Sequence, residues 1–465
     1  MGDPDKTKPE TKRHVPATIH GLPLVAVRLT SALVIFSLIL HGGFSVRKER
    51  AGQFIWLDAI LGCLLLADLF GALPKGRAWR EVMVSRRFEF VLVFIFAALA
   101  AVLSNLDRET FISLVAFFHL ASERELWANL LDLFLLLLVL VQLLRGTQHL
   151  LGRIKRPEAI LAGSFGVLVL AGTLLLLLPS ASANPDVPIS PLDAFFTATS
   201  AACVTGLVVR DTGVDFSAFG QMVILLIFQV GGLGIITFVA LLSIFSSRTL
   251  PLSQMIVFRH VVNAPKLSEL KKQIVAIVLV TAGIELAGAA FIYQAVPPGG
   301  DTFTHVRWSL FHSVSAFCNA GFALQSDSLE PYAGNLGFSF AIMVLIIFGG
   351  LGFLVIPDLL RFRITRSVFF RRFLFFRRMH SGHPPDRLSL HSRLALTLTG
   401  ILLVAGTLGF LLLESGHLLA GKSWGDRLLL SAFQSVTTRT AGFNTVPIGE
   451  LQSATLVFMA ILMVI

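Results

Sequence analysis

The chain repeats one short segment three times, and this segment holds the residues best able to do chemistry. Its copies are 195–210 (FFTATSAACVTGLVVR), 311–324 (FHSVSAFCNAGFAL) and 432–444 (AFQSVTTRTAGFN). Each copy begins as an apolar run with interspersed Ser and Thr, long enough for about three helical turns. Each then carries two small or polar residues and a glycine. A repeat at a nearly fixed period indicates that the fold is built from corresponding units.

The chemistry that such a segment can perform is cation binding by the main chain. A short helix followed by extended backbone is tolerated inside a membrane only where it lines a watery path. There, carbonyl oxygens can replace the hydration shell of a monovalent cation. Glycine lets the carbonyls turn inward, and the negative C-terminal end of the helix favours a cation. The predicted ion-binding residues, here called the filter segments, are Val204, Thr205, Gly206, Asn319, Ala320, Gly321, Thr440, Ala441 and Gly442.

A second glycine motif, GGLG, follows the first two filter segments. Its first glycine lies 25 residues after Gly206 in one case and 28 residues after Gly321 in the other. A single GGLG is more often a site of close helix packing or a kink, but its recurrence at this distance favours a role beside the pore. We expect both motifs to lie inside long apolar helices. The predicted gating or packing glycines are Gly231, Gly232, Gly234, Gly349, Gly350 and Gly352.

Several charged residues lie close to the filter segments in the sequence. Arg439 holds the position that Cys203 and Cys318 hold in the other copies. Because a positive charge in the pore would repel a cation, we expect Arg439 to point behind the filter and to pair with Glu414 as a structural brace. The two cysteines are predicted to pack there as small apolar residues. Nearby acidic residues could concentrate cations or serve as ordinary caps and turns; these are Asp193, Asp211, Asp215 and Asp327.

Composition places these segments in a polytopic membrane protein. The chain has 465 residues, of which 55% are hydrophobic and 14% are charged, a balance typical of membrane proteins. The net charge of +10 could suggest nucleic acid, but the basic residues lie in short loops between apolar spans. The positive-inside rule places those loops in the cytosol and all three pore loops on the external face. The three cysteines show neither disulfide nor metal-ligand spacing.

The apolar spans divide the chain into an N-terminal region and three repeats. We expect an all-α fold in which each repeat is a helix, a pore loop and a second helix. Four further transmembrane helices, at 23–44, 52–73, 88–106 and 126–145, are expected to precede the repeats. The predicted divisions are 1–20 (disordered cytosolic tail), 21–157 (four-helix membrane region), 158–272, 273–391 and 392–465 (repeats one to three, the last incomplete).

At these motifs the chain resembles the Trk/Ktr/HKT superfamily of potassium-translocating subunits, TrkH/KtrB type. The matching stretches are TATSAACVTGL, HSVSAFCNAGF and SVTTRTAGFNT. The resemblance implies four non-identical repeats around a pseudo-fourfold pore, of which three are present. Because the sequence stops inside the apolar run LVFMAILMVI, we expect a further C-terminal part. The resemblance also implies a homodimer and a cytosolic nucleotide-binding regulatory subunit, for which loops 248–272 and 361–393 are candidate docking surfaces.

The sequence therefore predicts potassium uptake across the cell inner (plasma) membrane by a multi-pass protein that is not an enzyme. Potassium is the substrate, no cofactor is expected in this chain, and the expected surroundings are membrane lipid and not nucleic acid. In the family, a glycine at this position in each repeat goes with potassium preference. One alternative is a sodium-permeable or sodium-coupled cation transporter of the same fold. A secondary transporter for an organic solute and an intramembrane enzyme or receptor are further alternatives.

Overall fold

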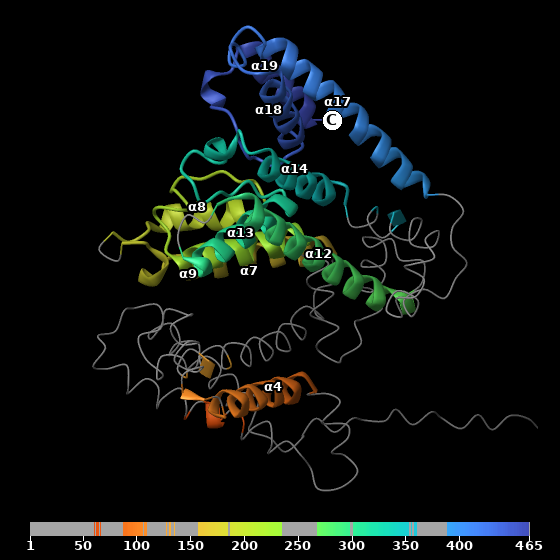
Figure 1. Cartoon of the computed structure of the whole chain (residues 1–465). Coiled ribbons are helices and arrows are strands. Elements are labelled where there is room, and N and C mark those ends of the chain that lie inside the picture. Colours follow the sequence, from red (N-terminus) through yellow and green to blue (C-terminus); the bar gives the residue numbers. More distant parts are fainter. Residues whose placement is uncertain are drawn as a thin grey trace, which may run out of the picture. The chain divides into compact units, whose positions relative to one another are not determined.

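The structure is a computed structural model, and the residues it describes are almost entirely helical (Figure 1). It describes residues 87–105, 157–184, 187–234, 267–297, 301–352 and 388–464, with isolated residues at 60–66, 107–108, 127–134 and 355–359. In those ranges the only β-type pairing is one isolated bridge between Ser182 and Phe216. The prediction of a helical chain is confirmed.

The chain separates into two compact units, and the filter segments all belong to the second. The first unit comprises 1–38, 46–116 and 120–145, and the second comprises 39–45, 117–119 and 146–465. Helix α4 (Arg87–Ser104) of the first unit coincides with the predicted span at 88–106. The predicted tail at 1–20 and the other three N-terminal spans fall outside the described residues, apart from isolated positions.

The second unit repeats one sequence of helices: long, short, then a second apolar helix. Its helices among the described residues are α7 (Pro157–Leu176), α8 (Pro191–Ala202), α9 (Ala218–Gly232), α12 (Leu267–Ala295), α13 (Thr302–Phe317), α14 (Leu336–Gly350), α17 (Leu390–Glu414), α18 (Trp424–Thr437) and α19 (Ser453–Val464). Single 3-10 turns lie at η2 (Pro179–Ala181), η3 (Glu330–Tyr332) and η5 (Ile448–Glu450). The short helices α8, α13 and α18 immediately precede the filter segments.

Each short helix begins at a side chain that caps it. Ser190 Oγ accepts from the Asp193 N–H at 3.1 Å, and Ser423 Oγ accepts from the Asp426 N–H at 3.2 Å. Asp301 accepts from two backbone N–H groups at the start of α13. Such caps stabilise a helix by about 1 kcal/mol each, so the sequence determines where each short helix starts.

The second helix of each repeat is tied at its start to the end of the first helix of that repeat or to the turn that follows it. In repeat one, Ser217 caps α9 and its hydroxyl donates to the Ser180 carbonyl. In repeat two, Asn335 caps α14 and its amide donates to the Ala295 carbonyl at 2.7 Å. In repeat three, the Glu414 carboxylate accepts from the Gln452 N–H at 3.0 Å. Three different side chains therefore fix the same helix-to-helix connection.

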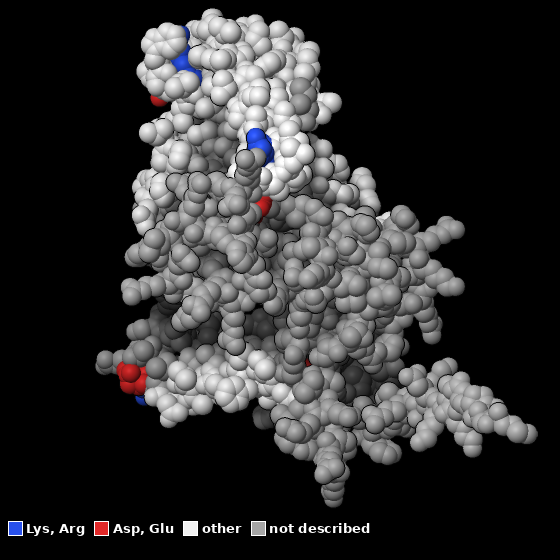
Figure 2. All heavy atoms as spheres, turned by 90° about the vertical axis from the view of Figure 1, so that its right-hand side faces the viewer, with Lys and Arg blue, Asp and Glu red and all other residues white. Residues whose placement is uncertain are grey.

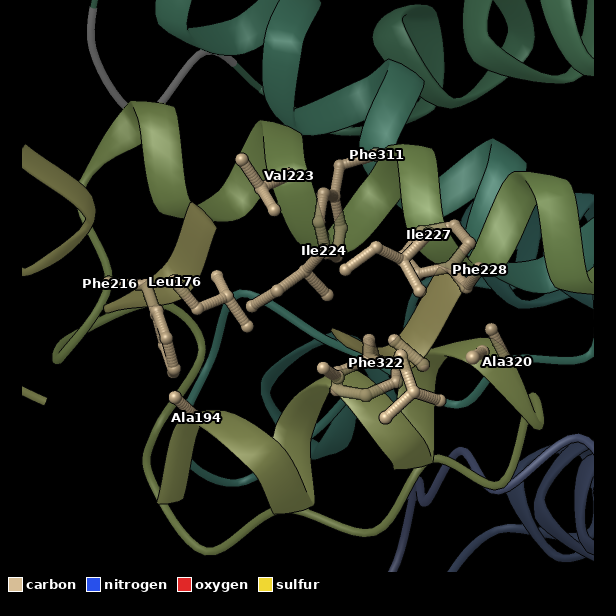
Figure 3. Close-up of a cluster of buried hydrophobic side chains, with 14 of the residues drawn as sticks. Leu176, Ala194, Phe216, Val223, Ile224, Ile227, Phe228, Phe311, Ala320 and Phe322 are labelled. Atoms are coloured by element: carbon tan, nitrogen blue, oxygen red, sulfur yellow. The ribbon is translucent and has the colours of Figure 1, made fainter. Parts of the chain in front are cut away.

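Consecutive repeats share their hydrophobic cores. The side chains of Phe228 (α9) and Phe311 (α13) meet edge to face, with ring centroids 5.5 Å apart. Phe228 also stacks on Phe322 with centroids 5.9 Å apart, and Figure 3 shows these rings within one buried cluster. A second cluster joins α14 to Phe433 and Phe443 of repeat three. Because aromatic pairs contribute beyond their buried area, these contacts hold the repeats together.

The outward surface of α17 is apolar. Its large exposed hydrophobic residues recur at intervals of three or four, which places them on one face of the helix; they are Leu390, Leu394, Leu398, Ile401, Val404, Leu408 and Leu412. A helix of a soluble protein turns its apolar face to the core. Within the described residues, Val275–Ala295 and Leu390–Glu414 are long and apolar enough to cross a membrane. Most of the described surface in Figure 2 likewise carries no charge.

Candidate functional site

The three filter segments, far apart in the sequence, meet at their glycines. A Cβ atom added to Gly206 would lie 3.1 Å from the Gly321 Cα, and one added to Gly321 would lie 3.1 Å from the Gly442 Cα. A Cβ on Gly442 would lie 3.3 Å from the Gly321 Cα. The backbone of repeat two therefore lies between those of repeats one and three, in direct contact with both.

The filter backbones share an unusual conformation. In each segment the residue two positions before the glycine has a positive φ, and so does the glycine itself. The φ values are 57° and 74° for Val204 and Gly206, 56° and 71° for Asn319 and Gly321, and 68° and 79° for Thr440 and Gly442. Positive φ is uncommon outside glycine, especially for a β-branched residue such as Val204. Strain of this kind persists only where the surroundings enforce it, and it is frequent at functional sites.

Hydrogen bonds to the short helix hold each filter segment in this conformation. The residue before each glycine donates its N–H to a carbonyl in the last turns of its own short helix. The bonds are Thr205 to Ser200 at 2.9 Å, Ala320 to Ser315 at 2.8 Å and Ala441 to Thr437 at 2.9 Å. Hydroxyl groups add to this: Ser315 Oγ donates to the Phe322 carbonyl at 2.8 Å, and Thr437 Oγ1 donates to the Phe443 carbonyl at 2.7 Å. The Ser and Thr residues of the repeat thus fasten the filter backbone.

The carbonyl groups of the filter segments are left without hydrogen-bond donors. In a trans peptide the C=O points opposite to the following N–H, so the carbonyls of Val204, Asn319 and Thr440 point away from their short helices. Among the described residues, no N–H or O–H donates to any of the nine filter carbonyls. The Ala320 oxygen would lie 2.5 Å from a Cβ on Gly206, and the Ala441 oxygen 2.8 Å from one on Gly321. Acceptor oxygens are therefore gathered where the segments meet.

The GGLG motifs lie at helix ends, which corrects the prediction that they lie inside long helices. Helix α9 ends at Gly232 and α14 ends at Gly350. Two residues later, Gly234 and Gly352 have φ values of 75° and 81°. A left-handed glycine at this position terminates a helix and satisfies its last carbonyls. The apolar character of the surrounding residues concealed this ending.

The first two glycines of each motif pack directly against the filter. A Cβ on Gly231 would overlap the Ala202 carbonyl, and one on Gly349 would overlap the Phe317 carbonyl; both carbonyls lie four residues before a filter glycine. A Cβ on Gly232 would lie 2.6 Å from the Cys318 Sγ, in the next repeat. The same relation recurs for Gly350, whose Cβ would lie 3.9 Å from an Arg439 nitrogen. These glycines allow close packing behind each filter segment.

The two cysteines differ, although the sequence predicts one role for both. Cys318 is partly buried behind its filter segment as predicted, against Gly232. Cys203 is exposed, so the prediction that it packs behind the filter is wrong. The physical reason is that Cys318 is covered by a helix of the preceding repeat. No such helix covers Cys203 among the described residues.

The predicted pairing of Arg439 with Glu414 is also wrong. The buried Glu414 carboxylate accepts from Gln452 N–H at 3.0 Å and also bonds Thr455 Oγ1 and His417 Nδ1. It therefore fastens the start of α19 to the end of α17. Arg439 lines a cavity of about 420 Å³ with Asn319 and Thr440, among other residues, and its Nη1 is buried without a hydrogen-bond partner in the described structure.

Three acidic residues of repeat one serve local structure. Asp193 forms an ion pair with Arg210 at 2.8 Å, and hydrogen bonding to this guanidinium lowers the pKa of the Asp193 carboxyl. Asp211 accepts from the Gly213 and Val214 N–H groups, and Asp215 accepts from the Asp211 N–H. Turn formation, one of the two alternatives given by the sequence, explains Asp211 and Asp215, whereas the ion pair with Arg210 explains Asp193.

Sequence reasoning did not predict Gln229, although it lies directly behind the second filter segment. Its amide contacts Glu285 and Cys318. The available signal was a polar side chain two residues before GGLG in an otherwise apolar helix.

Comparison with known proteins identifies the family. Residues 133–465 match the sequence pattern of TrkH, described as a cation transport protein. The chain belongs to the TrkH family. This family is described as one of cation transport proteins, which agrees with the prediction that the chain is not an enzyme.

Individual TrkH-type relatives are about one-third identical to the chain. It is 36% identical over 315 residues to Ktr system potassium uptake protein B of Bacillus subtilis, covering 66% of this chain and 65% of that protein. The protein of the same name from Vibrio alginolyticus is 37% identical over 316 residues, which are 66% of this chain and 64% of that protein. Potassium/sodium uptake protein NtpJ of Enterococcus hirae is 33% identical over 310 residues, 66% of this chain and 64% of that protein. The chain thus spans slightly under two thirds of these relatives.

Proposed function

We propose that the chain carries potassium ions across the cell inner membrane through a filter of backbone carbonyls. The observation that carries the proposal is the meeting of three glycine segments whose carbonyl oxygens receive no hydrogen bond from the described residues. Two of the relatives are named potassium uptake proteins, which supports potassium as the substrate. The predicted ion-binding residues are the nine filter residues given above.

The proposed mechanism depends on exchanging water for protein oxygens. A potassium ion entering the filter loses hydration, and carbonyls of Val204, Asn319, Thr440 and their successors replace it. The short helices α8, α13 and α18 end at the filter segments, so their partial negative charges favour the cation. An inward-moving monovalent cation gains ~2.3 kcal/mol per 100 mV of membrane potential, which concentrates potassium without nucleotide hydrolysis in this chain.

A sodium-permeable pore is the second candidate. It is favoured by one observation, the name potassium/sodium uptake protein of the Enterococcus hirae relative. Glycine at all three filter positions, which in the resembled family goes with potassium preference, favours potassium for this chain. The filter is therefore proposed to select potassium over sodium, with selectivity resting on a small number of carbonyl sites.

The assembly around the pore is likewise part of the proposal. We propose a multi-pass homodimer in which a fourth repeat completes a pseudo-fourfold pore and the N-terminal helices pack beside it. A cytosolic nucleotide-binding subunit is proposed to regulate it through loops 248–272 and 361–393, most of which lie outside the described residues. The chain itself requires no cofactor in this scheme.

Rescue and flux measurements test the proposal. The full-length protein should restore growth of a potassium-uptake-deficient bacterium in low-potassium medium. In reconstituted vesicles, Gly206→Ser should lower the potassium-to-sodium flux ratio, because the added side chain meets the Ala320 carbonyl at a left-handed position. Absence of potassium flux from folded wild-type protein would overturn the function, and an unchanged ratio in the variant would overturn the filter assignment.

A further inference from the structure

A chain of three hydrogen-bonded polar side chains, one buried and two partly buried, lies behind the second filter segment. The Gln229 Nε2 atom on α9 donates to both carboxylate oxygens of Glu285 on α12, at 2.9 and 3.0 Å. The Gln229 Oε1 atom accepts from the Cys318 Sγ at 3.2 Å. Cys318 is the C-terminal capping residue of α13 and directly precedes Asn319, the first residue of the filter segment. One amide therefore connects a carboxylate to the start of the filter.

The polarity of these contacts is fixed by the groups involved. Both Glu285 carboxyl oxygens accept from the Gln229 NH₂ group, which leaves the Gln229 oxygen facing Cys318. The thiol is then the donor. Glu285 is 5% exposed, and the described residues place no Lys or Arg within ion-pair distance of it. A buried polar group in a membrane helix is costly without partners, so the Gln229 amide is a required partner.

Two further contacts fix the region around Cys318, one from α12 and one from α9. Ser313 Oγ on α13 donates to the Glu285 backbone carbonyl at 2.6 Å, which fastens α12 to the short helix. Gly232, in the next turn of α9 after Gln229, leaves room for the Cys318 side chain, since a Cβ there would lie 2.7 Å from the Cys318 Cβ. Cys318 is thus enclosed by α9 while Gln229 binds its thiol.

The equivalent positions of the other repeats lack this arrangement. Cys203, three residues before Gly206, is exposed. Arg439, three residues before Gly442, has a buried guanidinium nitrogen without a partner among the described residues. The second filter segment is also the one in contact with both others, so its position affects the whole filter.

We propose that Gln229 and Glu285 are positioning residues for the second filter segment, acting through the Cys318 thiol. This inference rests on the proposed ion-conducting function. The Glu285 carboxyl group orients the Gln229 amide, the amide oxygen holds Cys318, and Cys318 sets the position of Asn319–Gly321. Selectivity between two alkali cations depends on the placement of the carbonyls, so the hydrogen-bond chain determines specificity without touching the ion.

The test compares potassium and sodium fluxes of the full-length protein reconstituted in lipid vesicles. Gln229→Leu and Cys318→Ala should each lower the potassium-to-sodium flux ratio by about fivefold, the equilibrium factor for one ordinary hydrogen bond. The double variant should fall no further, because both changes break the same connection. Cys318→Ser should recover the wild-type ratio, since its hydroxyl also donates to Gln229. Cys63→Ala, at an exposed cysteine of the first unit, should leave the ratio unchanged.

The outcomes separate this inference from the proposed function. If wild-type vesicles carry no potassium, the function itself fails. If wild type is selective but Cys318→Ala retains the wild-type ratio, the positioning role is wrong. Equal losses in Cys318→Ser and Cys318→Ala would also overturn it, because they would show that side-chain packing and not the hydrogen bond matters. If Gln229→Leu does not fold, Glu285→Gln provides a second test. It keeps the size of the side chain but removes its carboxyl group, and an unchanged potassium-to-sodium flux ratio would count against the role of Glu285.

Discussion

Glycine is required at the filter positions for two independent reasons. Each filter glycine has a positive φ, a conformation that costs a residue with a Cβ roughly 1 kcal/mol or more. The close approach of neighbouring backbones adds a second requirement. A Cβ on Gly206 would lie 2.5 Å from the Ala320 oxygen, and one on Gly321 would lie 2.8 Å from the Ala441 oxygen. Conformation and space therefore both require glycine at these positions.

Alanine substitution should therefore be more damaging at the filter than at a left-handed glycine with free space around it. Gly206→Ala and Gly321→Ala should reduce potassium flux and selectivity more strongly than Gly352→Ala, because they also force a neighbouring carbonyl to move. Potassium and sodium fluxes in vesicles, normalised to folded protein, measure the difference. Equal losses at all three positions would mean that backbone conformation alone explains the filter glycines.

Single residues also explain where sequence reasoning failed. The filter glycines and their Ser and Thr neighbours could be predicted because each copy repeats the same local chemistry. The different exposure of Cys203 and Cys318 could not be predicted, because it depends on whether a helix from another repeat covers the thiol. The partner of Glu414 could not be predicted either. Thr455 and Gln452 reach it through the folded connection of α17 to α19, and nothing local to Glu414 indicates them.

Glu414 provides a test of that connection at the level of helices. Replacing it with glutamine turns one acceptor oxygen into a donor facing the N–H and O–H groups that now donate to it. We expect Glu414→Gln to destabilise the fold by about 1.5–3 kcal/mol, the range for hydrogen bonds to a charged group. Thermal unfolding in detergent measures this, with the exposed Glu450→Gln as the matched control. Similar melting temperatures for both variants would contradict the proposed connection.

The observed helix boundaries show which helix starts and ends the sequence could predict. The predicted starts of the three repeats, 158, 273 and 392, lie one, six and two residues from the observed starts of α7 at Pro157, α12 at Leu267 and α17 at Leu390. The end of α9 at Gly232 and of α14 at Gly350 was missed, since apolar residues continue beyond both motifs and hydrophobicity alone signals no ending. The short helix α13 begins at Thr302, well before the predicted segment, because Asp301 caps it.

The two glycines of one motif should respond differently to substitution. Gly349→Ala would place a Cβ onto the Phe317 carbonyl, whereas Gly352→Ala meets no atom within 4 Å and is strained only by its φ of 81°. We expect Gly352→Ala to cost about 1 kcal/mol and Gly349→Ala to cost clearly more, because helix α14 must move away from α13. Detergent melting curves of the two variants provide the comparison. A Gly349→Ala protein as stable as Gly352→Ala would show that α14 does not press on the short helix.

At the scale of the whole second unit, one interface is used twice. Helix α9 packs against α13, and α14 packs against α18, so each second helix contacts the short helix of the next repeat. The glycine contacts follow the same rule, from Gly232 to Cys318 and from Gly350 towards Arg439. Repeating one interface between successive units arranges them around a common point, and here that point is the meeting of the filter glycines. The repeat pattern in the sequence predicted equivalent units, but the interface between them became apparent only in three dimensions.

The exposed apolar face of α17 predicts that lipid, and not water, surrounds this part of the second unit. Ile401 lies in the middle of the exposed apolar face of α17, with 58% of its surface exposed. In water an aspartate there would be harmless, since most exposed substitutions change stability by no more than about 0.5 kcal/mol. In a bilayer it would oppose insertion of the helix by about 3 kcal/mol. We therefore expect Ile401→Asp to deplete the protein from the membrane fraction, while Ile401→Ala and the helix-end variant Ser415→Asp remain there. Wild-type membrane levels of Ile401→Asp would mean that this face of α17 contacts protein or water instead of lipid.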